Sequence, residues 1–199
     1  MFDRRVDLTR PRLVLASASP RRRDLLSEAG YDVLIAASDV EEIDSCHEGP
    51  EALAVINAKR KWTAVAPQYP SEIVVAADTV VWLDGRFYGK PVDFAEAMKM
   101  LTVLSGRTHQ VVTGVAMGRT GEGLKEFAEV SLVTFHAFSE KEIVAYLKTI
   151  HPLDKAGAYA AQDDNGRLIA KVEGSISNVI GLPMEKLGAF LASENYRRQ

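Results

Sequence analysis

The sequence predicts an α/β fold in which an elongated mixed sheet is flanked by helices on both sides. Short, fully apolar runs suited to buried strands alternate with amphipathic stretches that begin at helix-capping residues. Hairpin signals, such as Asp84-Gly85, follow some of these runs, so neighbouring strands there are expected to be antiparallel. The sheet is therefore expected to be mixed rather than purely parallel. We find no linker and no internal repeat.

Each expected strand is a run of apolar or β-branched residues between turn signals. In chain order, the strands are expected at residues 13–16, 31–37, 73–77, 80–83, 111–117, 126–135 and 167–172. Asp78 is expected to interrupt the third run, and a glycine-rich tip at 118–123 joins the fifth and sixth.

Each expected helix begins at a capping residue or a proline. In chain order, the helices are expected at residues 20–29, 50–66, 94–104, 140–148 and 183–192. Ser19 is the expected N-cap of the first helix, Gly30 ends it, and Pro67 ends the second. An acidic, polar loop at 39–48 precedes the second helix.

Composition excludes several classes of protein. The chain has 199 residues, 47% of them hydrophobic and 26% charged, which excludes a disordered or fibrous protein. A net charge of −3 gives no general attraction to nucleic acid or to an anionic membrane. The single cysteine, Cys46, fits a reducing compartment. Residues 1–12 do not resemble a signal peptide and no apolar run is long enough to span a membrane, so we expect a cytoplasmic protein.

The segment Ser-Ala-Ser-Pro-Arg-Arg-Arg at 17–23 is the most informative one. Cations are disfavoured on the first turn of a helix by ~0.3–1 kcal/mol each, yet three arginines lie there. Together with the hydroxyls of Ser17 and Ser19 and the free N–H groups of the helix start, they would form a phosphate cradle. The alternative is a solvated helix start whose arginines pair with Asp24 or Glu28. Neither a Walker loop nor a GxGxxG motif occurs in the sequence.

Acidic residues could complete such a site. Asp78 follows an apolar run, and ligand sites in α/β folds lie at the carboxyl ends of strands. A carboxylate buried there needs a metal, a cation or turn N–H groups as partners, and the last of these would be a purely structural role. Glu41, Glu42 and Asp44 carry the hard oxygen ligands that Mg²⁺ or Mn²⁺ prefers, although such a loop is often simply solvated.

The remaining polar residues are less specific. Lys61 lies on a helix and Lys90 in the turn Gly89-Lys90-Pro91, positions that by themselves indicate no function. The histidines lack metal-ligand spacing and Cys46 has no second cysteine beside it, so a zinc site or a thiol protease is not expected. The histidines are His47, His109, His136 and His151.

Six stretches, taken in order, resemble the Maf family, also called septum formation inhibitor-like proteins. They are 15–22 (LASASPRR), 77–81 (ADTVV), 89–91 (GKP), 104–109 (LSGRTH), 154–159 (DKAGAY) and 181–183 (GLP). The resemblance implies a nucleotide pyrophosphatase with a two-lobed fold and a central cleft, similar to the inosine triphosphatase fold. It implies a single Maf-like domain at 1–199, with a core at about 13–191 and short tails.

The resemblance also implies roles for individual residues. Asp78 matches the family's proton-accepting carboxylate, and the polar cleft residues match Ser17, Arg21, Arg22, Glu42, Lys61 and Lys90. The combination of Arg21, Thr79 and Gln162 is typical of the branch that acts on dTTP and UTP, since a glutamine amide can both donate to and accept from a pyrimidine's imide edge. Two positions depart from the family pattern: Asp163, where glycine is common, and Trp62, where a small residue is common.

The resemblance implies in-line attack of water on the α-phosphorus of a nucleoside triphosphate, since the residues themselves do not fix which phosphorus is attacked. Asp78 and Glu42 would hold Mg²⁺ or Mn²⁺ together with phosphate oxygens, and Asp78 or the metal would activate the water. The arginines and lysines would stabilise the charge of the departing pyrophosphate.

Two alternatives remain open at this point. The first is a pyrophosphatase for N7-methyl-GTP, which Thr79 and Gln162 disfavour, and the second is a nucleotide-binding regulator of cell division with little catalysis, which Asp78, Glu42 and Lys90 disfavour. Neither nucleic acid nor a membrane is an expected partner, and a homodimer is suggested by the family resemblance alone.

Overall fold

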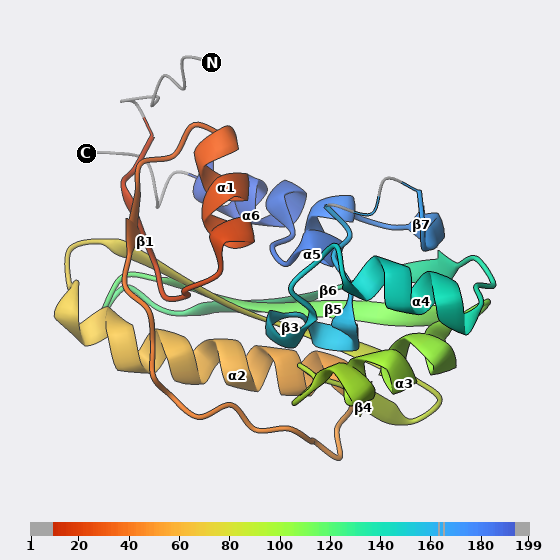
Figure 1. The fold of residues 1–199 in the computed structure, drawn as a ribbon. Helices are drawn as coiled ribbons and strands as arrows, with labels where there is room; N and C mark the ends of the chain where they lie inside the picture. The colour runs from red at the N-terminus through yellow and green to blue at the C-terminus, as the bar shows by residue number, and fades with distance from the viewer. Residues whose placement is uncertain (1–9, 163, 165, 194–199) are drawn as a thin grey trace.

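The computed structural model describes residues 10–162, 164 and 166–193 as one mixed sheet with helices on both faces (Figure 1). The strands are β1 (Leu13–Leu15), β2 (Val33–Ile35), β3 (Ile73–Leu83), β4 (Arg86–Tyr88), β5 (Thr108–Gly118), β6 (Lys125–Phe135) and β7 (Ile169–Glu173). The helices are α1 (Pro20–Glu28), α2 (Pro50–Val65), α3 (Phe94–Leu104), α4 (Glu140–Leu147), α5 (Ile176–Ile180) and α6 (Met184–Leu191). Short 3₁₀ turns cover Ala66–Gln68, Pro152–Asp154 and Ala156–Ala158. The predictions for residues 1–9 and for Asp163 fall outside the described residues.

The sheet is mixed, as predicted. Its strand order is β2-β1-β3-β5-β6-β7, with β4 paired to β3. The pairs β2–β1 and β1–β3 are parallel, whereas the pairs β3–β4, β3–β5, β5–β6 and β6–β7 are antiparallel. The expected hairpins at Asp84-Gly85 and at the glycine-rich tip are both present.

One edge of β3 is forked. The parallel strand β1 pairs with the beginning of β3, as far as Leu15 opposite Val75, and β4 pairs with its end, from Val81 onward. The other edge of β3 is occupied by β5. Residues 76–80 of β3 therefore lie in an opening between the ends of β1 and β4.

The prediction that Asp78 interrupts its strand is wrong. β3 runs without a break through eleven residues, and Asp78 pairs with Gly114 of β5 in its middle. The carboxylate does not end the strand because Lys61 and Asn57 of α2 bind it. The opening beside β3 nevertheless lies past the carboxyl end of β1, which is where a ligand site is expected in such sheets.

Helix α2 lies directly on one face of the sheet (Figure 1). A Cβ atom added at Gly114 would lie 2.2 Å from the carbonyl carbon of Ala54, so only glycine permits this approach. Because side chains alternate along a strand, Asp78 points toward α2 while Thr79 points to the opposite face. The close contact at Gly114 brings the α2 side chains within reach of Asp78.

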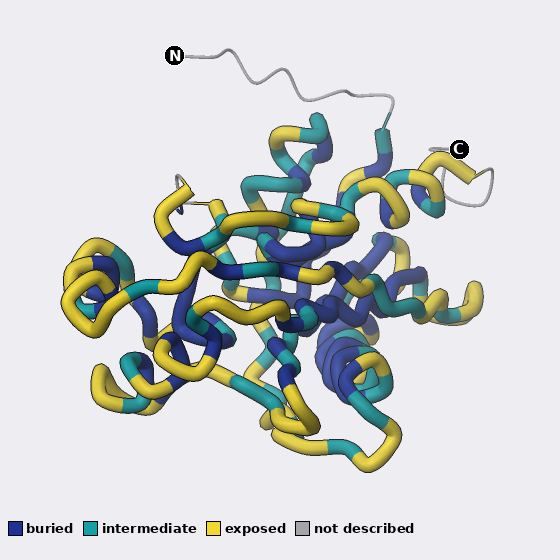
Figure 2. The backbone as a smooth tube through the Cα atoms, turned by 90° about the vertical axis from the view of Figure 1, so that its right-hand side faces the viewer, coloured by how far each residue is buried: buried dark blue, intermediate teal, exposed yellow. Residues whose placement is uncertain are grey.

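The opposite face carries two apolar cores, one on each side of Thr79, and they form the two lobes that were expected. The first core joins β1, α1 and α6 to the sheet through Leu15, Leu26, Val75 and Leu187. The second packs α3 and α4 against the other end of the sheet, with Leu101, Leu104, Val133, Phe135 and Ile143 at its centre. Buried segments accordingly fill the middle of the molecule, while exposed ones form its loops (Figure 2).

Several local features differ from the prediction. β2 spans only 33–35 rather than 31–37, and neither the helix α5 nor the short turns at 152–158 were expected. Ser19 occupies the N-cap position of α1, but its side chain caps nothing; instead its N–H donates to Ser17 Oγ at 3.2 Å. Among the described residues, none of the helices combines the length and apolar character needed to cross a bilayer.

Candidate functional site

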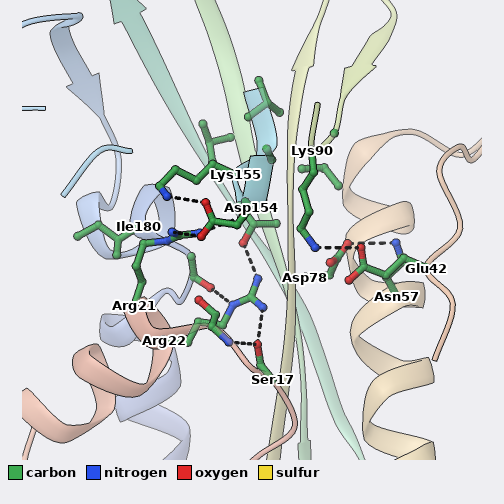
Figure 3. Close-up of a pocket in the computed structure, with 18 of the residues that line it drawn as sticks. Ser17, Arg21, Arg22, Glu42, Asn57, Asp78, Lys90, Asp154, Lys155 and Ile180 are labelled. Atoms are coloured by element: carbon green, nitrogen blue, oxygen red, sulfur yellow. Dashed lines mark hydrogen bonds and ion pairs between the residues drawn. The ribbon is translucent and has the colours of Figure 1, made fainter. Parts of the chain in front are cut away.

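A pocket of about 910 Å³ lies at the fork in β3 (Figure 3). Its volume is within the range of small-molecule sites, and both lobes contribute to its walls. It brings together nearly all the predicted site residues, namely Ser17, Ser19, Arg21, Arg22, Glu42, Lys61, Asp78, Thr79 and Lys90. Gln162 is exposed and is not among the lining residues, although Ala161 before it lines the pocket.

One wall of the pocket carries an acid–base cluster built around a buried lysine and a buried aspartate. The ammonium of Lys61 donates to Asp78 Oδ1 at 2.7 Å and contacts Glu42 Oε1 at 2.6 Å. The amide of Asn57 donates to the other oxygen of Asp78 at 3.1 Å. Asp78 and Lys61 are only 6% and 7% exposed, so one buried ammonium joins two carboxylates. Breaking a buried pair of this kind leaves an uncompensated charge, which is strongly destabilising.

Glu42 is held in its ionised form. Burial alone would raise its pKa, but Lys61, aided by Lys90 and Arg22, lowers the pKa of this carboxyl below its usual value. The second oxygen of Glu42 lies 3.8 Å from the ammonium of Lys90, a half-exposed lysine in the loop that follows β4. Glu42 therefore presents a charged carboxylate to the pocket at neutral pH.

Asp78 and Glu42 could hold a divalent cation only if another group supplies further oxygen ligands. Within the described part of the chain, no group of three or more His, Cys, Asp or Glu side chains is arranged to hold a metal ion. The two carboxylates share Lys61, so their oxygens are close together. Mg²⁺ is commonly bound by one or two carboxylates plus substrate phosphates. The donor set thus fits Mg²⁺ or Mn²⁺ if a bound nucleotide supplies further oxygens.

The opposite wall is built on Arg22. This guanidinium is 9% exposed and donates to Gly181 O at 2.8 Å, Ser17 Oγ at 3.0 Å and Thr79 Oγ1 at 3.0 Å. Burial lowers the pKa of Arg22, while the charges of Asp78 and Glu42 act to raise it. An arginine stays protonated in proteins, so a fixed positive charge faces the acid cluster across the pocket.

A chain of buried hydrogen bonds supports Arg22 from behind. Thr79 Oγ1 lies 2.9 Å from Thr113 Oγ1, and Thr113 donates to the carbonyl of Asn178 at 3.0 Å. The amide of Asn178 in turn donates to Ser131 Oγ at 2.9 Å. This polar band separates the two apolar cores and fixes the rotamer of Thr79.

Arg21 and Lys155 meet at Asp154, at the mouth of the pocket. Arg21 lies 3.4 Å from one carboxylate oxygen, and Lys155 donates to the other at 2.6 Å. Burial would raise the pKa of Asp154, but the two cations together lower it. Arg21 belongs to α1 and Asp154 to a turn of the other lobe, so this ion pair spans the opening.

Arg23, the third arginine at the start of α1, does not line the pocket. Arg23 is exposed and pairs with Asp24 at 2.9 Å. The alternative of a solvated helix start with locally paired arginines is therefore correct for Arg23, whereas Arg21 and Arg22 line the pocket.

Sequence reasoning missed several polar residues of the pocket, among them Asn57 and Lys155. Asn57 precedes Lys61 by one helical turn, and this spacing placed both on one face of α2. Lys155 is a buried cation in the turn after Asp154 and carries no local signal apart from the resemblance of its segment. Of the acidic loop, Glu42 and Asp44 line the pocket and Glu41 does not.

The arrangement suits a polyanion attached to a flat apolar group. Cations from both lobes, Arg21, Arg22, Lys90 and Lys155, surround the opening. Beside them the second lobe contributes an apolar wall that includes Val81, Phe87, Leu153, Tyr159 and Ile180. A phosphate chain would find charge on one side and a nucleobase would find apolar surface on the other.

Comparison with known proteins gives consistent results. The model of the family described as Maf-like protein matches residues 12–194. Proteins named dTTP/UTP pyrophosphatase are similar over nearly their whole length. The one from Myxococcus xanthus is 48% identical over 90% of this chain and 90% of its own. The one from Akkermansia muciniphila is 42% identical over 94% of this chain and 98% of its own.

A solved structure shares the fold. The Staphylococcus aureus Ham1 protein matches with a TM-score of 0.53, covering 90% of this chain and 97% of its own at 20% identity.

Proposed function

Because this chain belongs to the Maf-like protein family, we propose that it hydrolyses dTTP and UTP to the nucleoside monophosphate and pyrophosphate. Relatives that are 42–48% identical over at least 90% of this chain carry the name dTTP/UTP pyrophosphatase. The observation that carries the proposal is the Asp78–Lys61–Glu42 cluster, with Asp78 and Lys61 buried, that faces Arg22 across one pocket.

In this reaction Asp78 accepts a proton from the attacking water. Lys61 and Asn57 hold one oxygen each of its carboxylate, which fixes the direction of the lone pairs. A preorganised base of this kind needs no rearrangement when the transition state forms.

The cations around the pocket bind the phosphate chain. Arg22 is locked by its three hydrogen bonds and presents its charge without a loss of side-chain entropy on binding. Arg21, Lys90 and Lys155 are tied to single carboxylates that phosphate oxygens can replace. They stabilise the negative charge of the departing pyrophosphate.

The proposal includes a divalent cation, Mg²⁺ or Mn²⁺, held by Asp78 and Glu42. When bound, the cation neutralises phosphate charge and orients the nucleotide. The support for it is the pair of adjacent carboxylates and their shared Lys61.

The reaction is tested with a panel of nucleoside triphosphates in Mg²⁺ or Mn²⁺, with pyrophosphate and orthophosphate measured separately. We expect pyrophosphate from UTP and dTTP, and little from purine nucleotides. Release of orthophosphate would contradict cleavage at the α-phosphorus, and preferential turnover of N7-methyl-GTP would favour the other branch. An absence of turnover combined with tight UTP binding would favour a nucleotide-binding regulator.

The assignment of base recognition to Arg21, Thr79 and Gln162 remains a prediction. Arg21 and Thr79 line the pocket, whereas Gln162 is exposed beyond its edge. The variant Gln162→Glu is expected to lower kcat/KM for UTP by about 10-fold, since a carboxylate cannot donate to a pyrimidine carbonyl. Equal rates on UTP would remove Gln162 from base recognition.

The cellular setting is proposed on the same basis. The lone Cys46 is unpaired, in keeping with a reducing cytoplasm. The homodimer suggested by the family resemblance remains a prediction that light scattering after gel filtration can check.

A further inference from the structure

Asn57 is a buried amide that contacts both acidic segments of the pocket. It lies on the inner face of α2 and is 2% exposed. Its Nδ2 donates to Asp78 Oδ2 at 3.1 Å and to Ile43 O at 2.9 Å, and its Oδ1 accepts from the N–H of Ile43 at 2.9 Å. Both donors and the acceptor of this side chain are therefore used.

The first of these bonds fixes the orientation of the Asp78 carboxylate. The terminal torsion of an aspartate is broad, so a single donor leaves the carboxylate free to rotate. Lys61 binds Oδ1 and Asn57 binds Oδ2 from adjacent turns of the same helix. With a donor on each oxygen, the plane of the carboxylate is set by α2.

The other two bonds fix the backbone beside Glu42. Between β2 and α2 the chain has neither helix nor strand from residue 36 to residue 49. Within that segment, Asn57 pairs with both the N–H and the carbonyl of Ile43, as a neighbouring strand would. Glu42, the residue before Ile43, is thereby held with its Oε1 2.6 Å from the ammonium of Lys61.

The helix that carries Asn57 is itself firmly seated. Gly114 lets the backbone of α2 lie against β5, directly opposite Asp78 in the sheet. Asn57 therefore ties both the Asp78 carboxylate and the loop that carries Glu42 to the same helix.

We infer that Asn57 is a positioning residue that locks Asp78 and the Glu42 loop into a single reactive arrangement. Its hydrogen bonds go to Asp78 and to the backbone of Ile43 beside Glu42, and none goes to a cation of the pocket, so it acts through the two carboxylates. This inference rests on the proposed function, because it assigns Asp78 and Glu42 to the reacting end of the nucleotide.

The test uses the full chain with Asn57→Leu, which keeps the volume, and Asn57→Asp, which keeps one acceptor but places a carboxylate oxygen toward Asp78. We expect kcat for UTP to fall by about 10- to 100-fold in both variants, as is typical when a partner of a catalytic carboxylate is removed. KM for UTP and the affinity for a non-hydrolysable α,β-imido analogue are expected to change by less than about threefold, because the phosphate-binding cations are untouched.

Two further measurements separate positioning from general destabilisation. Val65→Ala on the same helix removes buried volume away from the pocket, and it is expected to lower the unfolding midpoint without lowering kcat. Hydrogen exchange of the peptide covering residues 38–46 is expected to accelerate in Asn57→Leu and not in Val65→Ala, since the N–H of Ile43 loses its acceptor.

Wild-type kcat in Asn57→Leu, or equal kinetic losses in Asn57→Leu and Val65→Ala, would overturn the inference. Unchanged exchange at residues 38–46 would do the same. Should the wild-type protein release no pyrophosphate, the proposed function fails, and the exchange experiment still tests whether Asn57 holds the loop.

Discussion

The two faces of β3 at the pocket differ in how their polar groups are held. On the face toward α2, Asp78 is bound by Asn57 and Lys61, which lie one turn apart on a single helix. On the other face, Arg22 is bound by groups that are far apart in the chain, including Thr79 and the carbonyl of Gly181. The acidic face therefore depends on one helix–sheet contact, whereas the basic face forms only when the N-terminal and C-terminal segments pack together.

The largest expected effect comes from removing the charge on the acidic face. Asp78→Asn keeps the shape of the side chain but lowers its capacity to accept a proton, so pyrophosphate release from UTP is expected to fall at least about 10³-fold. Lys61 keeps Glu42 as a charged partner, so the variant is expected to fold, with a lower free energy of unfolding. Circular dichroism checks the fold and a pyrophosphate assay the rate. Glu41→Gln, at an exposed carboxylate of the neighbouring loop that does not line the pocket, is the matched control and is expected to retain activity. Turnover near the wild-type rate in Asp78→Asn would remove Asp78 from the mechanism.

Arg22→Lys, which conserves the charge, is expected to disrupt the hydrogen bonds that hold the basic face. Arg22 binds Gly181, Ser17 and Thr79 through three different nitrogens, and in Arg22→Lys the three donors radiate from one nitrogen that cannot reach all of these positions. We expect kcat/KM for UTP to fall by about 10²-fold, with KM raised. The exposed Arg23→Lys serves as the control. An unchanged KM in Arg22→Lys would show that this guanidinium is structural and does not bind phosphate.

A change at the contact between α2 and the sheet is expected to affect the acidic face more than the basic face. Gly114→Ala puts a methyl group into the backbone of Ala54, so α2 must move and the free energy of unfolding is expected to fall by about 2–3 kcal/mol. Because Asn57 and Lys61 move with α2, kcat is expected to fall more than nucleotide affinity. Gly188→Ala on α6, where a Cβ meets nothing within 4 Å, is expected to leave stability equal or about 0.5–1 kcal/mol higher. Equal stability of Gly114→Ala and wild type in urea would contradict the close contact.

The smallest expected effect comes from His109, which lies in the apolar core beside the pocket and belongs to neither the acidic nor the basic face. His109 is buried against Phe135, with its Nε2 bonded to the Tyr159 hydroxyl, and burial lowers its pKa from 6.5 to about 4. The unfolded chain takes up this proton first, so stability falls as the pH drops from 6.5 to about 4. At pH 5 the loss is about 2 kcal/mol.

His109→Gln is expected to remove that part of the slope while leaving stability near neutral pH little changed. Urea unfolding at pH 7.5 and pH 5 measures the difference between the two proteins. Identical slopes in the variant and the wild type would show that the pH dependence arises in the ionised pocket groups.

Elements with strong local signals were predicted well. The helices expected at 94–104 and 140–148 form behind the capping residues Asp93 and Ser139, whose side chains accept backbone N–H bonds, and the hairpin at Asp84-Gly85 forms as expected. The helix α5 was missed because its five residues carry too few apolar positions to show a period, even though Ser175 caps it. Asp78 was placed at a strand end because a lone carboxylate in an apolar run usually marks one, and nothing nearby in the sequence reveals its partners on α2.

The sequence by itself determined that the sheet is mixed, that three arginines crowd one helix start, and that polar side chains are available for a phosphate site. Local backbone preferences and side-chain periodicity decide such features. Only the tertiary structure decided which arginine enters the pocket, that Lys61 joins Asp78 to Glu42, and that Asn57 holds the loop beside them. These depend on how closely α2 approaches the sheet and on where the chain ends pack, distances that no spacing along the chain encodes.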